Sequence, residues 1–159
     1  MAPPPLKLPA LDPASVKAVE GTNYPDAYKP RVAGRAKRRL GDALGLTSFG
    51  VNLTTIKPGA GSALRHWHSH EDEFIYIVSG ELVLVTNAGE QVLTPGMCAG
   101  FPAGKADGHC LVNRTGRDAV YLEIGDRDPQ DDVAYPDDDL KAIGTPQGRK
   151  MTRKDGTPY

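Results

Sequence analysis

Between residues 46 and 125 the sequence alternates short apolar or β-branched runs with turns rich in glycine and proline. The runs cover residues 46–56, 74–78, 81–86, 90–93, 97–101, 109–113 and 120–124. Short strands with a turn signal every 8–12 residues are typical of a β-sandwich or barrel. No run of helical periodicity of comparable strength lies between them, which argues against alternating strands and helices. The sequence therefore predicts an all-β fold.

Side-chain alternation within the runs predicts how individual strands are used. Phe49, Val51 and Leu53 share one parity, which is the pattern of a half-buried strand. The runs on either side of Ser79-Gly80 are β-branched and aromatic, and the glycine between them predicts a hairpin.

Length and composition limit the class of protein. A chain of 159 residues with 39% hydrophobic residues is expected to form one domain that buries about 70% of its unfolded surface. A net charge of −1 argues against a general nucleic-acid binder, which usually carries a basic excess. No apolar run approaches the about 20 residues of a membrane span, and the first residues lack the pattern of a secretion signal. Cys98 and Cys110 do not make a disulfide framework and are expected to be small core residues, so we expect a cytoplasmic protein with reduced thiols.

The flanks differ in character from residues 46–125, and we expect three parts. Residues 1–45 are an N-terminal arm and basic segment, because five prolines fall within residues 1–14 and five Lys or Arg within residues 31–39. The basic run is either a phosphate or nucleic-acid patch or a surface that pairs with other charges. Residues 126–159 are an acidic extension, which we expect to form a surface strap with a short helix at 137–142. Its aspartates offer the counter-charge if the basic run at residues 31–39 pairs with other charges.

One stretch, residues 65–80, carries the ligand chemistry. His66, His68 and His70 lie within five residues, and Glu73 follows them. Residues two apart in a strand share a face, so either His66 with His68 or His68 with His70 can direct two imidazoles at one point. His109 opens a later strand and offers a third imidazole. Imidazoles with one carboxylate suit a transition-metal ion.

Two spaced patterns run through this region. The first is His66-x-His68-x₄-Glu73-x₆-Gly80. The second is Gly96-x₅-Pro102-x-Gly104-x₄-His109-x₃-Asn113. Together they resemble the two motifs of the cupin family, with the flanking strands extending the likeness to residues 46–125. This chain departs from the family pattern in two places: Gly61 stands five positions before His66 rather than six, and four residues separate Gly104 from His109 where two are usual.

The resemblance implies a fold and a site. The fold is a double-stranded β-helix, or jelly-roll barrel, with the extended N-terminal arm and the C-terminal strap outside it. The metal ligands carried over are His66, His68, Glu73 and His109, holding a divalent transition metal (Zn, Fe, Mn or Ni) with positions left open. His70 is then a surface or supporting residue, and Trp67 packs outside the cavity. The resemblance also implies a homodimer, formed through an exposed sheet edge.

Function follows from the site rather than from the fold. Ile75 and Ile77 share the parity of Glu73 and should line the interior, which favours a compact, largely apolar ligand. The leading hypothesis is a metal-dependent enzyme acting on a small organic molecule, of the dioxygenase, isomerase or epimerase, or lyase type. The alternatives are a non-catalytic module that binds or senses a small molecule, and a metal site that serves stability alone.

Overall fold

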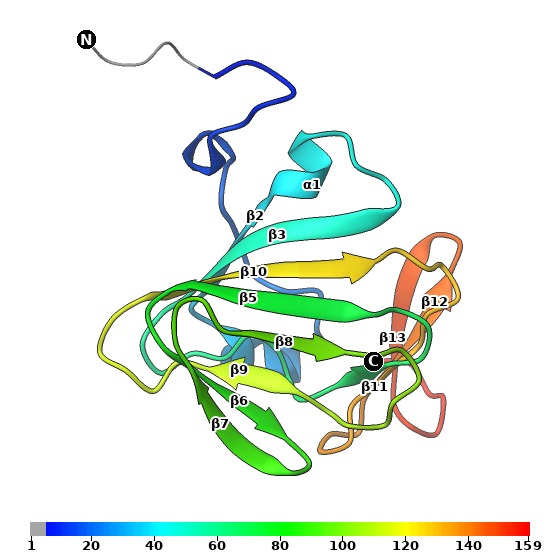
Figure 1. Cartoon of the computed structure of the whole chain (residues 1–159). Helices are drawn as coiled ribbons and strands as arrows, with labels where there is room; N and C mark the ends of the chain where they lie inside the picture. The colour runs from blue at the N-terminus through cyan, green and yellow to red at the C-terminus, as the bar shows by residue number, and fades with distance from the viewer. Residues whose placement is uncertain (1–5) are drawn as a thin grey trace, which may run out of the picture.

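The computed structural model describes residues 6–159, and its β-rich architecture confirms the predicted fold class (Figure 1). The first five residues, where the predicted N-terminal arm begins, lie outside the described part. The strands are β1 (Val19–Glu20), β2 (Arg35–Arg39), β3 (Phe49–Ile56), β4 (Trp67–His68), β5 (Glu73–Ser79), β6 (Leu82–Thr86), β7 (Gly89–Leu93), β8 (Cys98–Phe101), β9 (Cys110–Val112), β10 (Ala119–Asp126), β11 (Val133–Ala134), β12 (Lys141–Thr145) and β13 (Gly148–Thr152). The short helical segments are η1 (Pro13–Ser15), η2 (Asp26–Val32) and α1 (Leu40–Ala43). No helix within residues 6–159 is long and apolar enough to cross a membrane.

Two antiparallel sheets form the walls of a jelly-roll barrel. The larger has the order β1-β2-β3-β10-β5-β8, and the smaller has the order β7-β6-β9. In Figure 1 the larger sheet lies above the smaller one, with its inner face turned towards it. The core between them is formed by apolar side chains from both sheets: Ile56, Ala60, Ile75, Ile77, Leu82, Leu84, Leu93, Leu111, Ala119 and Tyr121.

The hairpin predicted at Ser79-Gly80 is wrong. β5 pairs with β10 and β8, whereas β6 pairs with β7 and β9, so the bend carries the chain from one sheet to the other. Gly80 has a φ of +74°, and a Cβ added there would lie 2.7 Å from the Cα of Ala119. Only glycine fits such a close approach at a positive φ. A glycine turn of this kind can therefore connect strands of two different sheets. Side-chain alternation does not predict which strands pair, so the sequence pattern could not distinguish this connection from a hairpin.

The alternation predicted on β3 is present, but the apolar parity faces outward. Asn52 lies along the cavity and Thr54 is buried, while Phe49 is 40% exposed. Neighbouring strands add further apolar side chains to the same outer surface, where Leu53 faces Leu122 across the β3–β10 pair. We call this surface the outer apolar face: Phe49, Val51 and Leu53 on β3, Leu122 and Ile124 on β10, and Phe74, Tyr76 and Val78 on β5.

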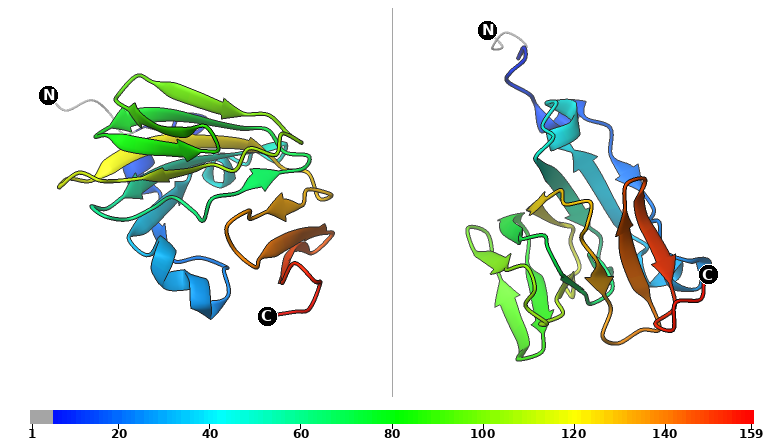
Figure 2. Two further views of the ribbon diagram at one scale, coloured as in Figure 1. Left: turned by 90° about the horizontal axis from the view of Figure 1, so that it is seen from below. Right: turned by 90° about the vertical axis from the view of Figure 1, so that its right-hand side faces the viewer.

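The C-terminal extension forms a sheet of its own against the barrel. Its order is β13-β12-β11-β4, so the extension pairs with the strand that carries His68. Figure 2 shows the β12–β13 hairpin, coloured orange to red, standing beside the barrel and near η2. A second apolar core lies beneath it: Tyr24, Val32, Leu64, Val133, Tyr135, Leu140 and Ala142. The short helix expected at residues 137–142 is absent, because that segment leads into β12, which buries Ala142 in this core.

Candidate metal centre and its cavity

Local pairing brings the three predicted histidine ligands together. His68 ends β4, and His66 lies two residues earlier on the same face. His109 precedes β9 and forms an antiparallel bridge with His66, in which each backbone N–H donates to the other residue's carbonyl at 3.1 and 2.8 Å. This bridge places His109 beside His66 in spite of the longer spacing after Gly104.

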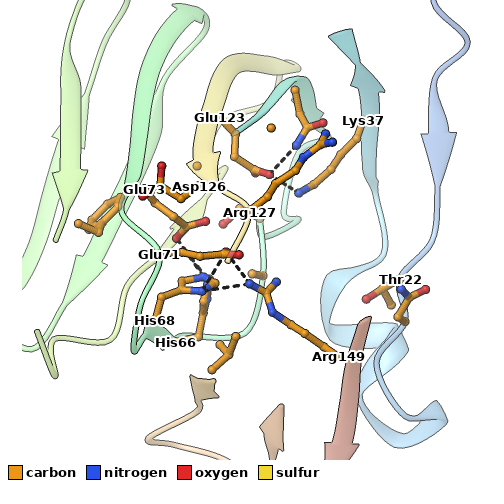
Figure 3. A pocket seen from close by; sticks show the side chains of 18 of the residues that line it. Thr22, Lys37, His66, His68, Glu71, Glu73, Glu123, Asp126, Arg127 and Arg149 are labelled. Atoms are coloured by element: carbon orange, nitrogen blue, oxygen red, sulfur yellow. Dashed lines mark hydrogen bonds and ion pairs between the residues drawn. The ribbon is translucent and has the colours of Figure 1, made fainter. Parts of the chain in front are cut away.

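The imidazoles converge on one carboxylate oxygen. Oε2 of Glu73, the first residue of β5, lies 2.8 Å from Nε2 of His109, 3.4 Å from Nε2 of His68 and 3.6 Å from Nε2 of His66. The ligand atoms of His66, His68 and Glu73 all lie within 4.8 Å of one another. Figure 3 shows these side chains at one end of a cavity. The four residues named by the sequence patterns are therefore neighbours in space.

The donor set fits a divalent transition metal. Nδ1 of His66 donates to the carbonyl of Leu64 at 2.8 Å, and Nδ1 of His68 donates to Oδ2 of Asp131 at 2.6 Å. Each bond holds the proton on Nδ1 and leaves the Nε2 lone pair towards Glu73, as metal-binding imidazoles require. The His109 ring stacks on Phe101 with centroids 3.5 Å apart, which fixes its orientation.

Burial and charged neighbours shift the pKa values of three of the four candidate ligands. Burial alone would raise the pKa of Glu73, but the contact with Nε2 of His109 and the neighbouring rings of His66 and His68 lower it well below its ordinary value. Burial lowers the pKa of His109, and the neighbouring His66 acts in the same direction. Burial would also lower the pKa of His68, but the hydrogen bond to Asp131 and the charge of Glu73 raise it. An ionised carboxylate and neutral imidazoles are the forms that bind a cation, so Glu73 and His109 are shifted towards the binding form and His68 is not.

Asp131 supports the centre from the C-terminal extension, and the sequence analysis did not identify it. It lies two residues before Val133, which pairs with His68 on β4. Its side chain is fully buried, and it accepts hydrogen bonds from the His68 ring and from the backbone N–H of His70 at 2.9 Å. These bonds counter the effect of burial and lower the pKa of Asp131 to about 2.

His68, Glu71 and Asp131 form a second group of potential metal ligands. Nη2 of Arg149, on β13, lies 2.5 Å from a Glu71 oxygen and 2.6 Å from an Asp131 oxygen. This guanidinium supplies the positive charge that the two carboxylates require, so the group is an ion-pair network. Through this network the β12–β13 hairpin is connected to His68, one of the proposed metal ligands.

Asp131→Asn is expected to weaken metal binding about 10- to 100-fold, because the amide holds the His68 ring in place less strongly than the carboxylate does. Competition with a chelator of known affinity measures the effect. Asp132→Asn is the control, since Asp132 is adjacent and pairs with Lys141 rather than with a histidine. Equal metal affinity in wild type and Asp131→Asn would contradict a supporting role for Asp131.

A cavity of about 860 Å³ extends from the metal centre. Its wall combines many charged side chains with apolar ones such as Phe101 and Leu111, which corrects the expectation of a compact, largely apolar ligand. Ile75 does line it, as expected, but Ile77 is fully buried in the core. The charged side chains around the cavity are Arg35, Lys37, Arg39, Asp42, Glu71, Glu73, Glu123, Asp126, Arg127, Asp128 and Arg149.

Glu123 also lies inside this cavity, where three side-chain hydrogen bonds hold its carboxylate in place. Its Oε1 accepts from Nζ of Lys37 at 2.5 Å and from the Asn52 amide at 3.1 Å, and its Oε2 accepts from the Tyr121 hydroxyl at 2.9 Å (Figure 3). Burial would raise the pKa of Glu123, but the positive charge of Lys37 outweighs it and lowers that pKa. Glu123 faces Ile75 across the β10–β5 pair, so Glu73 is its diagonal neighbour, about 7 Å away along the sheet.

The remaining residues singled out by sequence are not part of the centre. His70 is exposed and bonds to Ser69, as expected for a surface residue. Trp67 does not line the large cavity; it lines a second one of about 310 Å³, which His68 and His109 also border. Cys98 is exposed rather than buried in the core, and Cys110 is half-buried, so the expectation for Cys98 is wrong; both thiols are free.

Comparisons with known proteins agree with this architecture. The cupin domain family matches residues 52–125. Among curated proteins, none matches the chain significantly. Among solved structures, a sugar phosphate isomerase of the cupin superfamily from Silicibacter pomeroyi is 45% identical, with a TM-score of 0.92, over 95% of this chain and 96% of that one.

Two further structures extend the comparison. A protein provisionally named as a sugar phosphate isomerase, from Acidithiobacillus ferrooxidans, is 30% identical with a TM-score of 0.74, over 82% of this chain and 83% of that one. A polyketide cyclase from Streptomyces resistomycificus is 21% identical with a TM-score of 0.61, over 74% of this chain and 78% of that one, and supports the fold alone. With the two sequence patterns, the jelly-roll barrel and a relative 45% identical over almost the whole length, this chain belongs to the cupin superfamily.

Proposed function

We propose that the protein is a metal-dependent isomerase that interconverts the aldose and ketose forms of a small phosphorylated sugar. The observation that carries the proposal is the pairing of two kinds of group in one cavity. Three imidazoles and Glu73 stand at one end, and an ionised carboxylate held by Lys37 stands on the adjoining wall. The names of the two relatives at 45% and 30% identity support this choice over dioxygenase or lyase chemistry.

His66, His68, Glu73 and His109 would hold the ion. When bound, a divalent metal polarises the substrate carbonyl and makes the neighbouring C–H more acidic. The protein must then supply a base that removes the proton from one carbon and returns it to the next. A cavity of about 860 Å³ is large enough for a five- or six-carbon sugar phosphate, because small-molecule sites typically measure about 300–1,000 Å³.

Glu123 is the base that this arrangement favours. Its lowered pKa keeps it ionised at neutral pH, and its contacts with Lys37, Asn52 and Tyr121 fix its position on the inner face of β10. Lys37 and Tyr121 are the hydrogen-bond donors nearest to it, so they can serve the substrate oxygens that change protonation during the transfer. Glu71 is the less suitable carboxylate, because its partner Arg149 also binds Asp131 and so belongs to the network that orients the proposed ligand His68.

Metal-dependent turnover tests the proposal. The protein is stripped with a chelator, reconstituted separately with Zn, Fe, Mn and Ni, and offered pentose and hexose phosphates in their aldose and ketose forms. We expect isomerisation that is lost on stripping and restored by at least one metal. Tight binding of a sugar phosphate with no turnover under any metal would instead favour the non-catalytic sensing alternative.

The outer apolar face supports a homodimer as the working form. Solvent-facing surfaces of antiparallel sheets are usually polar, whereas Phe74, Tyr76 and Val78 here are 40–45% exposed beside apolar neighbours on β10. Extended apolar patches of this kind mark protein contacts. A second copy of the chain is the occupant we propose, since two such sheets can pack face to face.

Val78→Glu is expected to convert the dimer to a monomer, because it places a charge within that contact. Light scattering after size exclusion should give twice the chain mass of 17.0 kDa for wild type. The matched control is Val92→Glu on β7, where a valine is 54% exposed outside the outer apolar face. A monomeric wild type, or a Val78→Glu protein that remains dimeric, would contradict the proposed contact.

A further inference from the structure

The basic stretch at residues 31–39 does not act as one surface. Arg31 pairs with Asp138 in the acidic extension, as the charge-pairing interpretation expects. Arg35, Lys37 and Arg39 lie instead on β2, where alternate residues share a face, and all three line the large cavity. Arg38, between them, points away and donates to the carbonyl of Val16.

The three cations on this face of β2 differ in how their charges are neutralised. Lys37, in the middle, pairs with Glu123. Arg35 donates only to backbone carbonyls, and its Nε atom is buried with no hydrogen-bond partner among the described residues. The Arg39 side chain makes no hydrogen bond or ion pair with any residue in 6–159, although its backbone pairs with β3. Two cations facing one cavity therefore lack a counter-charge from the chain, which is costly for a half-buried group such as Arg35.

The other arginines of the cavity are already neutralised. Arg127 pairs with Asp42, and Arg149 pairs with both Glu71 and Asp131. Neutral hydrogen-bonding residues, Thr22 and Asn23, line the cavity as well. In Figure 3, Thr22 and Lys37 appear on the side of the cavity opposite His68 and Glu73.

We propose that Arg35 and Arg39, on either side of Lys37, form the subsite for the phosphoryl group of the substrate. This inference rests on the proposed function, since it assigns one part of the same cavity to one part of a sugar phosphate. A guanidinium presents paired N–H groups that match two phosphate oxygens. The sugar then spans the distance between β2 and the metal centre, with its carbonyl end at the centre and Glu123 between the two.

Binding of inorganic phosphate to the metal-stripped full chain tests the subsite, because removal of the metal leaves only protein groups to bind the anion. Arg35→Gln and Arg39→Gln are each expected to weaken phosphate binding at least about tenfold, as loss of a charge-assisted hydrogen bond implies. Arg38→Gln is the matched control on the opposite face of the same strand and should bind phosphate like the wild type. Isothermal titration calorimetry measures all four proteins.

Arg39→Gln guards against a folding artefact, because the Arg39 side chain has no bond to the rest of the described chain. Unchanged phosphate affinity in both cavity variants, or an equal loss in Arg38→Gln, would overturn the subsite.

Turnover measurements distinguish failure of the subsite from failure of the proposed function. If the reconstituted enzyme isomerises a sugar phosphate and the two variants show the wild-type KM, the subsite fails and the function stands. If no turnover occurs but phosphate binding needs Arg35 and Arg39, the function fails and the subsite stands.

Discussion

Replacing His66 and His68 together by alanine is expected to abolish metal binding, with a loss of affinity of at least about 10³-fold. The pair provides half of the proposed ligands, and a full set of four ligands in zinc-finger peptides binds structural zinc with about 10–16 kcal/mol. Elemental analysis of the purified protein should fall from near one ion per chain to background. Because activity needs the ion, isomerisation should disappear with it.

His70→Ala is the control for this experiment, since it removes the same type of side chain from the same stretch. His70 is exposed, and its ring bonds only to Ser69. This variant should keep wild-type metal content and turnover. A double variant that still carries a full equivalent of metal would show that the ion binds elsewhere in the chain.

Glu123→Gln is expected to lower kcat about 10²- to 10⁴-fold, the usual contribution of a general base. The amide is nearly isosteric and still accepts a hydrogen bond from Lys37 or Asn52, so the fold and the metal content should be retained. The loss should fall on kcat rather than on KM, because Glu123 takes part in the proton transfer and not in phosphate binding. Steady-state kinetics with the metal at full occupancy measures both constants.

Two further variants test whether Glu123, rather than another carboxylate, is the general base. Glu90→Gln changes an exposed glutamate that pairs with Arg114 far from the cavity wall, and it should leave kcat unchanged. Glu71→Gln changes another cavity carboxylate that is not one of the proposed metal ligands. If Glu71→Gln lost turnover while Glu123→Gln kept it, the base would belong to the network around Arg149 instead.

Local pattern was sufficient to predict most of the strands, and the resemblance to the cupin motifs supplied four candidate ligands that the fold brings close together. The resemblance to the first cupin motif selected His66 and His68 over the pair with His70, because Glu73 and Gly80 then take the positions of the motif's glutamate and glycine. The longer step before His109 did not displace it, since its backbone bridge to His66 fixes its position. These features depend on residues close in sequence or on one strand pairing with its neighbour.

The supporting groups could not be predicted, because they depend on tertiary contacts. Asp131 is 63 residues from His68, and only the β11–β4 pairing brings them together. Strand alternation identified the two faces of β3 but not which of them would face the cavity, so Asn52 was missed. Lys37 was noted only as part of a basic run, and Glu123 was not noted at all. Their pairing requires β2, β3 and β10 to be neighbours in the sheet.

The most direct test of the central claim follows a sugar phosphate by proton NMR in D₂O with the metal-reconstituted protein. We expect the aldose and ketose forms to interconvert and the product to carry deuterium on the carbon that receives the proton, because Glu123 exchanges the abstracted proton with solvent. The chelator-stripped protein should do neither. No interconversion at full occupancy by any of Zn, Fe, Mn or Ni, or interconversion that persists undiminished after the metal is removed, would contradict a metal-dependent isomerase.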